Sequence, residues 1–306
     1  MIQINVRAAL EVDSGVPPLR VCQESVMYKD IVVPIIGNQG DKFAINVALD
    51  IALAQRARLT VLEVLSLPTL PAIPFGLLPD QGMTLVYDEL RRQSHGNVKA
   101  WQDALAGEQV PHEVLLVEAL FTEPAQLAAR HAHHADLAVV AGVSGDSSAG
   151  DVAHDFVAAM LMLSGRPLLV VPQRCKTEIP PRRIVVAWQP TAGCARAIHD
   201  ALPLLRAAEQ VEVLVVDPVA GDDEDAGKPG AEVTAHLVRH GVRAELQVRN
   251  SNDNRVATVL LDHARNMHAN MLVVGGYGHS RLREWALGGV TRELLFSATL
   301  PVFYSH

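Results

Sequence analysis

Short runs of hydrophobic residues alternate along the chain with segments whose hydrophobic positions recur at helical spacing. Residues 31–36 form a continuous apolar run that ends at Gly37, residues 43–57 follow with the helical period, and residues 59–65 are again typical of a strand. A run, a helical period and a second run predict a strand–helix–strand unit.

The pattern continues to residue 171. It predicts helices near residues 85–106, 124–133 and 156–163, and strands at residues 113–117, 137–141 and 168–171. Residues 173–181 are polar, contain prolines and show no period, so we interpret them as a linker between two domains.

After this linker the same order of elements begins again. Strands are predicted at residues 184–188, 211–216, 244–248, 271–274 and 302–304, with helices near residues 194–208, 231–240, 255–268 and 290–296 between them. Right-handed crossovers place such helices on both faces of a parallel sheet. The predicted fold class is therefore α/β, with two tandem doubly wound, Rossmann-like domains at residues 27–172 and 182–306. Residues 1–26 lack a hydrophobic period and are expected to be a poorly ordered extension, with Met27 as an alternative start.

Composition narrows the classes of function. A net charge of −8 in 306 residues argues against a protein that neutralises nucleic-acid phosphates. Cys22, Cys175 and Cys194 are widely separated, so neither a disulfide framework nor a zinc site is predicted and a cytoplasmic location is expected. No segment approaches the roughly 18 apolar residues of a membrane span, so no membrane partner is expected.

In doubly wound sheets, ligands bind beyond the carboxyl ends of the strands, where the strand order reverses. In the second repeat this places the candidate site in the loops 189–193 and 275–289. The second loop contains Gly275, Gly278 and Gly288. Glycine lets a backbone approach a phosphate closely, and a helix N-terminus presents unpaired N–H groups to it. We expect the N–H groups of Gly289, Val290 and Thr291 to face such phosphates. The alternative is that these glycines only make a long loop compact.

This loop resembles the nucleotide loop of the universal stress protein family, whose pattern is Gly, two residues, Gly, nine residues, Gly, then Ser or Thr. The resemblance covers nearly the whole chain from Met27. It implies a tandem universal stress protein that binds ATP or another adenine nucleotide, with Mg²⁺ left open. Backbone groups near Ala187 and Val216 would read adenine, and Gln189 would contact ribose. The full candidate set is Ala187, Gln189, Val216, Gly275, Gly276, Gly278, His279, Arg281, Gly288, Gly289, Val290 and Thr291.

Two residues depart from the family pattern. Gly289 stands where Ser or Thr is expected, and Gln189 stands where ATP-binding members usually carry Asp. A hydrogen bond to a charged group contributes roughly 1.5–3 kcal/mol, so one absent hydroxyl would weaken binding about 10- to 100-fold.

The first repeat matches the pattern less well. Gly142 and Gly145 reproduce the opening glycine pair, but Asp155 stands where the third glycine is expected and Ile36 where Asp is expected. Asp151 and Asp155 would also repel phosphates. We interpret this half as a degenerate, largely structural partner.

Other clusters point to surface or packing roles. His131, His133 and His134 are interpreted as a solvated helix end, although metal binding is the alternative. Residues 221–225 form an acidic loop without the pattern of a calcium site. Ser144 and Ser164 lie outside any GxSxG motif. Near the loops, Arg283 and Glu284 could contact phosphate or form a salt-linked surface. Trp188 and Trp285 are interpreted as packing residues, stacking on a ligand being the alternative.

The sequence thus favours an adenine-nucleotide-binding, stress-response regulatory protein without a dedicated enzyme activity, slow ATP hydrolysis being left open. The alternatives are a non-binding interaction scaffold and an α/β enzyme that processes adenylates. The expected partner is a small nucleotide, and no protein partner is identified. The resemblance also implies that the two domains form an intramolecular pseudo-dimer by pairing their terminal strands, with a further homo-oligomer left open.

Overall fold

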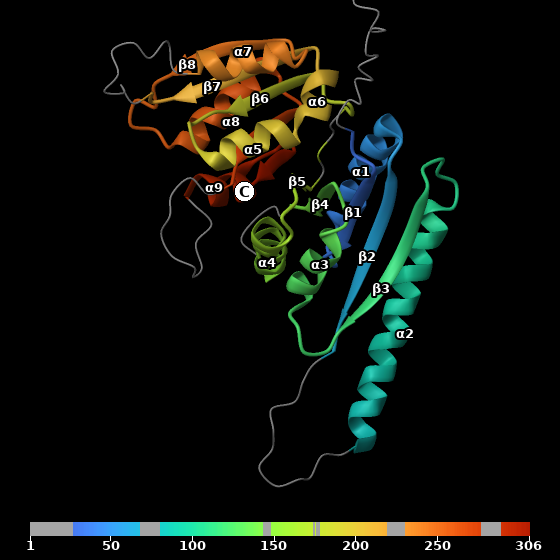
Figure 1. Cartoon of the computed structure of the whole chain (residues 1–306). Coiled ribbons are helices and arrows are strands. Elements are labelled where there is room, and N and C mark those ends of the chain that lie inside the picture. Colours follow the sequence, from blue (N-terminus) through green and yellow to red (C-terminus); the bar gives the residue numbers. More distant parts are fainter. Residues whose placement is uncertain are drawn as a thin grey trace, which may run out of the picture.

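A computed structural model describes residues 27–67, 80–142, 148–173, 175, 178–218, 230–276 and 289–306. Within these residues the strands form one ten-stranded sheet, in the order β3-β2-β1-β4-β5-β10-β9-β6-β7-β8, with helices on both faces (Figure 1). The predicted extension at residues 1–26 lies outside the described residues. The fold is the α/β, largely parallel arrangement that the sequence predicts.

The first half of the chain forms one side of this sheet. Its elements in chain order are β1 (Asp30–Ile35), α1 (Asp41–Gln55), β2 (Arg58–Ser66), α2 (Asp80–Leu105), β3 (His112–Ala119), α3 (Pro124–Ala132), β4 (Leu137–Ala141), α4 (Ser148–Leu163) and β5 (Leu168–Val171). All of these strands run parallel to their neighbours within this half.

The second half repeats the arrangement. Its elements are β6 (Arg183–Ala187), α5 (Ala192–Asp200), α6 (Leu202–Ala207), β7 (Gln210–Val216), α7 (Ala231–Arg239), β8 (Ala244–Arg249), α8 (Val256–Met267), β9 (Met271–Gly275), α9 (Gly289–Ser297) and β10 (Val302–Ser305). These strands are also parallel to one another.

The two halves join through their terminal strands. β5 and β10 are antiparallel, and Leu169 lies opposite Phe303 at the centre of this pairing. This is the terminal-strand pairing that the resemblance implies. The hydroxyl of Tyr28 in the first half also donates to the backbone carbonyl of Asp200 in the second half at 2.7 Å. The strand pairing and this polar contact therefore hold the halves together.

Two hydrophobic cores extend through both halves, one on each face of the sheet. The first packs strand residues such as Val33 and Val186 against α1, α5 and α6. The second packs residues such as Val140 and Leu272 against α3, α4, α8 and α9. Burial on both faces explains why β4, with the sequence LAVVA, is a continuous apolar run and not an alternating one.

Two helices differ from the prediction. The single helix expected near residues 194–208 is divided into α5 and α6, because Pro203 cannot donate the hydrogen bond of a helix interior and lies in the first turn of α6. The helix expected from residue 156 begins earlier, at Ser148. Among the described residues, no helix is long and apolar enough to cross a membrane.

Candidate functional site

The strand order reverses between β6 and β9 in the second half. The chain moves outward from β6 through β7 to β8, and then returns to place β9 on the other side of β6. The connections that leave the carboxyl ends of β6 and β9 therefore diverge, and doubly wound sheets bind their ligands at such a point. The candidate loops 189–193 and 275–289 follow these two strand ends.

Gly275, at the end of β9, contacts the start of α5. A Cβ atom at Gly275 would lie 2.5 Å from the backbone N of Cys194 and 2.7 Å from its Sγ. Real Cβ atoms do not approach other atoms so closely, so only glycine fits here without a shift of the helix. The structure therefore gives Gly275 a packing role, the close approach of β9 to α5.

Gly276 lies at the junction of the two halves. Its backbone N–H donates to the carbonyl of Ser305 at 2.7 Å. A Cβ atom at Gly276 would lie 3.0 Å from Leu161 on α4 of the first half, and one at Gly193 would lie 2.6 Å from the carbonyl oxygen of Gly276. The beginning of the candidate loop is thus fixed by packing against α5 and against the first half.

The far end of the loop leads into α9, which begins at Gly289. Gly289 is exposed, and a Cβ atom there would meet no heavy atom within 4 Å. Val290 is half-buried and Thr291 is buried. The first N–H groups of an α-helix have no partner within the helix. Of the three residues predicted to face phosphates, Gly289 is the exposed one.

A cavity of about 730 Å³ adjoins this helix start and is lined mainly by α9, including Gly289, Val290 and Glu293, and by residues 254–256 at the start of α8. Arg255 and Arg292 also line it, and Arg255 forms a 3.7 Å ion pair with Glu293. The sequence analysis missed both arginines because they lie outside the glycine loop. Arginine is well suited to bind phosphate.

The residues proposed to hold the base and ribose lie at the ends of neighbouring strands. Ala187 ends β6 and is half-buried, Gln189 follows it and is exposed, and Val216 ends β7 and is buried. Trp188, between Ala187 and Gln189, donates its backbone N–H to Leu214 at 2.9 Å and packs against the core.

Several predicted residues lie outside the described part of the chain. They are Gly278, His279, Arg281 and Gly288 of the candidate set, together with Arg283, Glu284, Trp285, residues 221–225, Ser144 and Gly145. Their roles in binding stay predictions.

The strand register corrects the comparison of the two glycine loops. Val171 lies opposite Ala141 in the first half, and Ser305 lies opposite Gly275 in the second. Gly142 and Gly276 follow these residues and make the same backbone hydrogen bonds, at 2.6 and 2.7 Å. Gly142 therefore corresponds to Gly276 and not to Gly275. The glycine spacing misplaced it by one residue, and Ala141 occupies the position of close helix approach.

The loop lengths also differ between the halves. Residues 142–147 separate β4 from α4, whereas residues 276–288 separate β9 from α9. Because α4 begins earlier, Asp155 lies within a helix and not before its N-terminus. The third glycine is therefore missing from the first half because extra helical turns replace the long loop.

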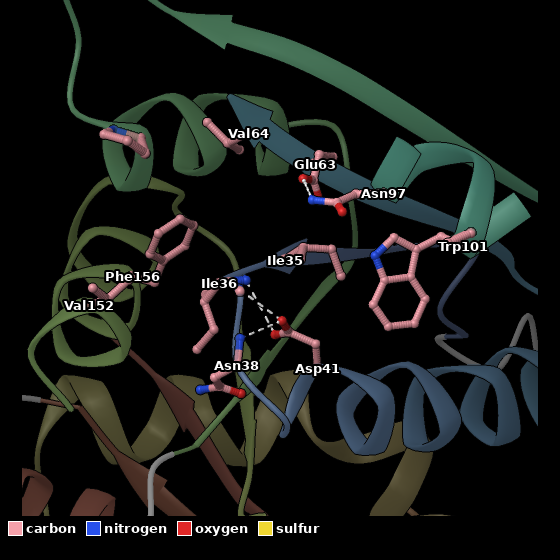
Figure 2. A pocket seen from close by; sticks show the side chains of 13 residues that line it. Ile35, Ile36, Asn38, Asp41, Glu63, Val64, Asn97, Trp101, Val152 and Phe156 are labelled. Carbon is pink, nitrogen blue, oxygen red and sulfur yellow. Dashed lines mark hydrogen bonds between the residues drawn. The ribbon is translucent and has the colours of Figure 1, made fainter. Parts of the chain in front are cut away.

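The first half has its own cavity at the equivalent place, where β1 and β4 diverge (Figure 2). It measures about 520 Å³ and is lined by the end of β1, the loop to α1, β2 and residues of the four helices α1 to α4. Asp41 lies at its base and is 2% exposed. One carboxylate oxygen accepts from the Ile36 N–H at 3.2 Å, and the other accepts from Gly37 and Asn38 at 2.9 and 3.0 Å.

Burial raises the pKa of Asp41 to about 6, and the charge of Glu63 adds to this shift while the three N–H groups oppose it. Glu63 is also buried and lines the same cavity. The sequence analysis missed this pair. The sequence feature that could have revealed the pair is Glu63, a charged residue inside the apolar run of β2.

The other clusters have structural contacts. His133 Nε2 lies 2.9 Å from the carbonyl of Leu163, and Ser164 Oγ donates to the carbonyl of Met160. No group of three or more His, Cys, Asp or Glu side chains within the described residues could hold a metal ion.

Comparison with known proteins identifies the family and the solved structures that this chain resembles. The universal stress protein family model matches residues 27–172 and 181–304. A universal stress protein from Archaeoglobus fulgidus aligns with a TM-score of 0.67 and 13% identity, over 90% of this chain and 94% of that one. A functionally unknown protein from Pseudomonas aeruginosa aligns with a TM-score of 0.51 and 14% identity, over 90% and 92%. A universal stress protein in complex with cAMP matches 48% of this chain and 98% of its own, with a TM-score of 0.31 and 22% identity.

No curated protein matches the chain. The two family matches together cover most of its length, and each corresponds to one half of the ten-stranded sheet. The chain belongs to the universal stress protein family and carries two copies of its domain.

Proposed function

We propose that the second half binds an adenine nucleotide in the crevice between β6 and β9, and that binding regulates how the protein interacts with a partner in a stress response. The phosphates would lie at the N-terminus of α9, and the base would lie near Ala187 and Val216. The observation that carries the proposal is the exposed start of α9 at Gly289, directly after the glycine-spaced loop.

Helix geometry and charge support this placement. The first turn of α9 offers unpaired N–H groups and the positive end of the helix dipole, both of which favour a phosphate. Gly289 adds no side chain that would occupy this space. Arg255 and Arg292 line the adjoining cavity and would supply positive charge.

Regulation would follow from the loop at residues 276–288. A nucleotide can shift the balance between two loop conformations only if it binds them with different affinity. The two ends of the loop, Gly276 and Gly289, are held by the junction of the halves and by α9. A nucleotide that contacts both ends would therefore favour one loop conformation, which a partner could recognise.

A charge introduced at residue 289 provides a direct test of where the phosphates bind. Gly289→Asp places a carboxylate where the phosphates would lie, although the open space around Gly289 leaves the fold intact. A negative charge in the first helical turn stabilises a helix by about 0.3–1 kcal/mol, so this variant should be at least as stable as the wild type. Its affinity for ATP, measured by calorimetry on the full chain, should fall at least about tenfold, or ~1.4 kcal/mol.

Gly289→Ser is the matched control, because it occupies the same space without a charge. It restores the hydroxyl of the family pattern and should bind ATP at least as tightly as the wild type. Equal ATP affinity in the Asp and Ser variants would overturn the proposed placement of the phosphates. Native mass spectrometry of the freshly purified protein would separately show whether an adenine nucleotide is retained, and its absence together with no calorimetric binding would favour the scaffold alternative.

A further inference from the structure

The cavity of the first half differs from a phosphate site in the charge of its lining. Asp41 and Glu63 are 2% and 7% exposed, and both line it. The other polar side chains of the lining are the amides of Asn38 and Asn97, and no Lys, Arg or His lines this cavity among the described residues. Two carboxylates without a basic neighbour disfavour an anionic ligand and favour a cation.

Glu63 has one carboxylate oxygen without a partner. Its Oε1 accepts from Asn97 Nδ2 at 2.9 Å, whereas Oε2 is buried and has no hydrogen-bond partner. A buried charged acceptor without a partner is costly, because it has lost water and gained no donor. In Figure 2 the Glu63 side chain leaves β2 beside the cavity and meets Asn97 from α2. A ligand donor that reaches this oxygen would supply the missing hydrogen bond.

Asn38 supplies the only other unpartnered buried polar atom in the described lining. Its Oδ1 accepts from the Gly40 N–H at 2.6 Å, and Nδ2 has no partner. This amide nitrogen is an uncharged donor that a hydroxyl or a water molecule can satisfy. It does not offset the two carboxylates.

The remaining lining is apolar. Ile35, Ile36, Val64 and Phe156 form part of the wall, and Trp101 of α2 adds an aromatic face. An aromatic face attracts a cation, and an apolar wall favours a hydrophobic ligand body.

We propose that this cavity binds a small molecule with a primary ammonium group on an apolar body, with the ammonium donating to Glu63 and the body packing against Trp101 and Phe156. The first half is then not only structural: it holds a ligand of opposite charge to the nucleotide proposed for the second half.

Benzylamine, protonated at neutral pH, is a suitable probe because it joins an ammonium group to one aromatic ring. Benzoate has nearly the same shape and the opposite charge. Ligand efficiencies of small molecules correspond to a dissociation constant of about 1 mM for a probe of this size. Calorimetry on the full chain without nucleotide should show binding of benzylamine and none of benzoate. No benzylamine binding, or equal binding of both probes, would overturn the proposal.

Glu63→Gln tests the acceptor. The Gln oxygen can still accept from Asn97, but its amide group presents a donor where Oε2 presented an acceptor. Benzylamine affinity should fall about tenfold or more, the loss expected for a hydrogen bond to a charged group. Glu245→Gln on β8 removes an equal charge from an exposed position at the opposite edge of the sheet and should leave the affinity unchanged. Equal affinity in Glu63→Gln and the wild type would overturn the proposal.

An NMR titration of the wild type makes the test independent of the variant's stability. Benzylamine should shift the backbone amide signals of Gly37 and Asn38 and the indole N–H signal of Trp101, which all belong to the cavity. Shifts confined to other residues would place the binding elsewhere and would contradict the proposal.

Discussion

The two halves share a strand order but carry different residues at three equivalent positions. Ala141 at the end of β4 corresponds to Gly275 at the end of β9. Counting from the paired strand residues Ile31 and Ile184, Asp41 corresponds to Cys194 at the start of the first helix. These differences change which side chains stand at the carboxyl ends of the strands in the two halves.

The third position is occupied by Asp155 and Gly289. Counting back from Leu168 and Val302, which occupy equivalent places in the sheet, brings these two residues together. Asp155 lies inside α4, whereas Gly289 begins α9. At the three positions the first half thus has Ala, Asp and Asp, where the second half has Gly, Cys and Gly. A duplicated fold can keep its core and still change the charge of its crevice, because crevice residues contribute little to the core.

The largest expected difference between the halves concerns the residue before α9. Gly288→Val should lower ATP affinity at least about a hundredfold, or ~2.7 kcal/mol, and leave the protein folded. Gly288 lies outside the described residues, so this prediction rests on the glycine spacing and on the start of α9. A β-branched residue would place methyl groups where phosphate approaches the helix N-terminus. Gly288→Ala should have a milder effect. Calorimetry gives the affinity and circular dichroism the fold.

His154 provides the matched control, because it occupies the equivalent position in the first half. It lies within α4, so His154→Val should leave ATP affinity unchanged if nucleotide binds only in the second half. Wild-type affinity in a folded Gly288→Val variant would contradict the predicted site. Loss of affinity in His154→Val would contradict the assignment of nucleotide to one half.

A smaller difference is expected in stability at Ala141 and Gly275. Gly275→Ala places a Cβ atom 2.5 Å from the backbone of Cys194, so α5 must move. Overpacking of this kind costs about 1–3 kcal/mol of unfolding free energy. The reverse change, Ala141→Gly, creates no clash and should cost only about 1 kcal/mol. Denaturant unfolding of both variants measures the two costs. A smaller cost for Gly275→Ala than for Ala141→Gly would show that the close approach relaxes easily.

The strands could be predicted from the sequence because each is a short apolar run buried on both faces. β4 and β5 begin and end at the predicted residues. The division between α5 and α6 was available from Pro203 and was missed because the apolar period continues through it.

The charged crevice of the first half was less predictable. The burial of Asp41 depends on three N–H groups that converge only after the turn before α1 has formed. The family pattern places Asp at the end of the first strand, where this chain has Ile36. The first half was therefore interpreted as degenerate. Glu63 carried a visible signal as a charge in an apolar strand, but its meeting with Asn97 joins residues far apart in sequence.

The last expected difference between the halves is a pH dependence of stability that arises from Asp41 in the first half. Burial raises the pKa of Asp41 to about 6 in the folded state, above the ordinary aspartate pKa of 3.8 that applies when the chain is unfolded. The folded state therefore holds this proton more tightly than the unfolded state does. The resulting stabilisation is fully present below about pH 4 and is lost as the pH rises through about 6. Among the residues that the structure describes, Glu63 is the other titratable group that lines the cavity.

Asp41→Asn removes this titration and keeps an acceptor oxygen for part of the N–H cluster. The difference in unfolding free energy, wild type minus Asp41→Asn, should decrease by about 2–3 kcal/mol between pH 4 and pH 7, because a pKa shift of one unit corresponds to about 1.4 kcal/mol. The difference between the two proteins removes the contribution of every group that titrates equally in both. The remaining change of unfolding free energy with pH therefore reports Asp41 and its coupling to Glu63. Denaturant unfolding at several pH values measures it. A difference that rises with pH would mean that the three N–H groups outweigh burial and hold the carboxylate charged, and the first-half crevice would then tolerate its negative charge without a cation.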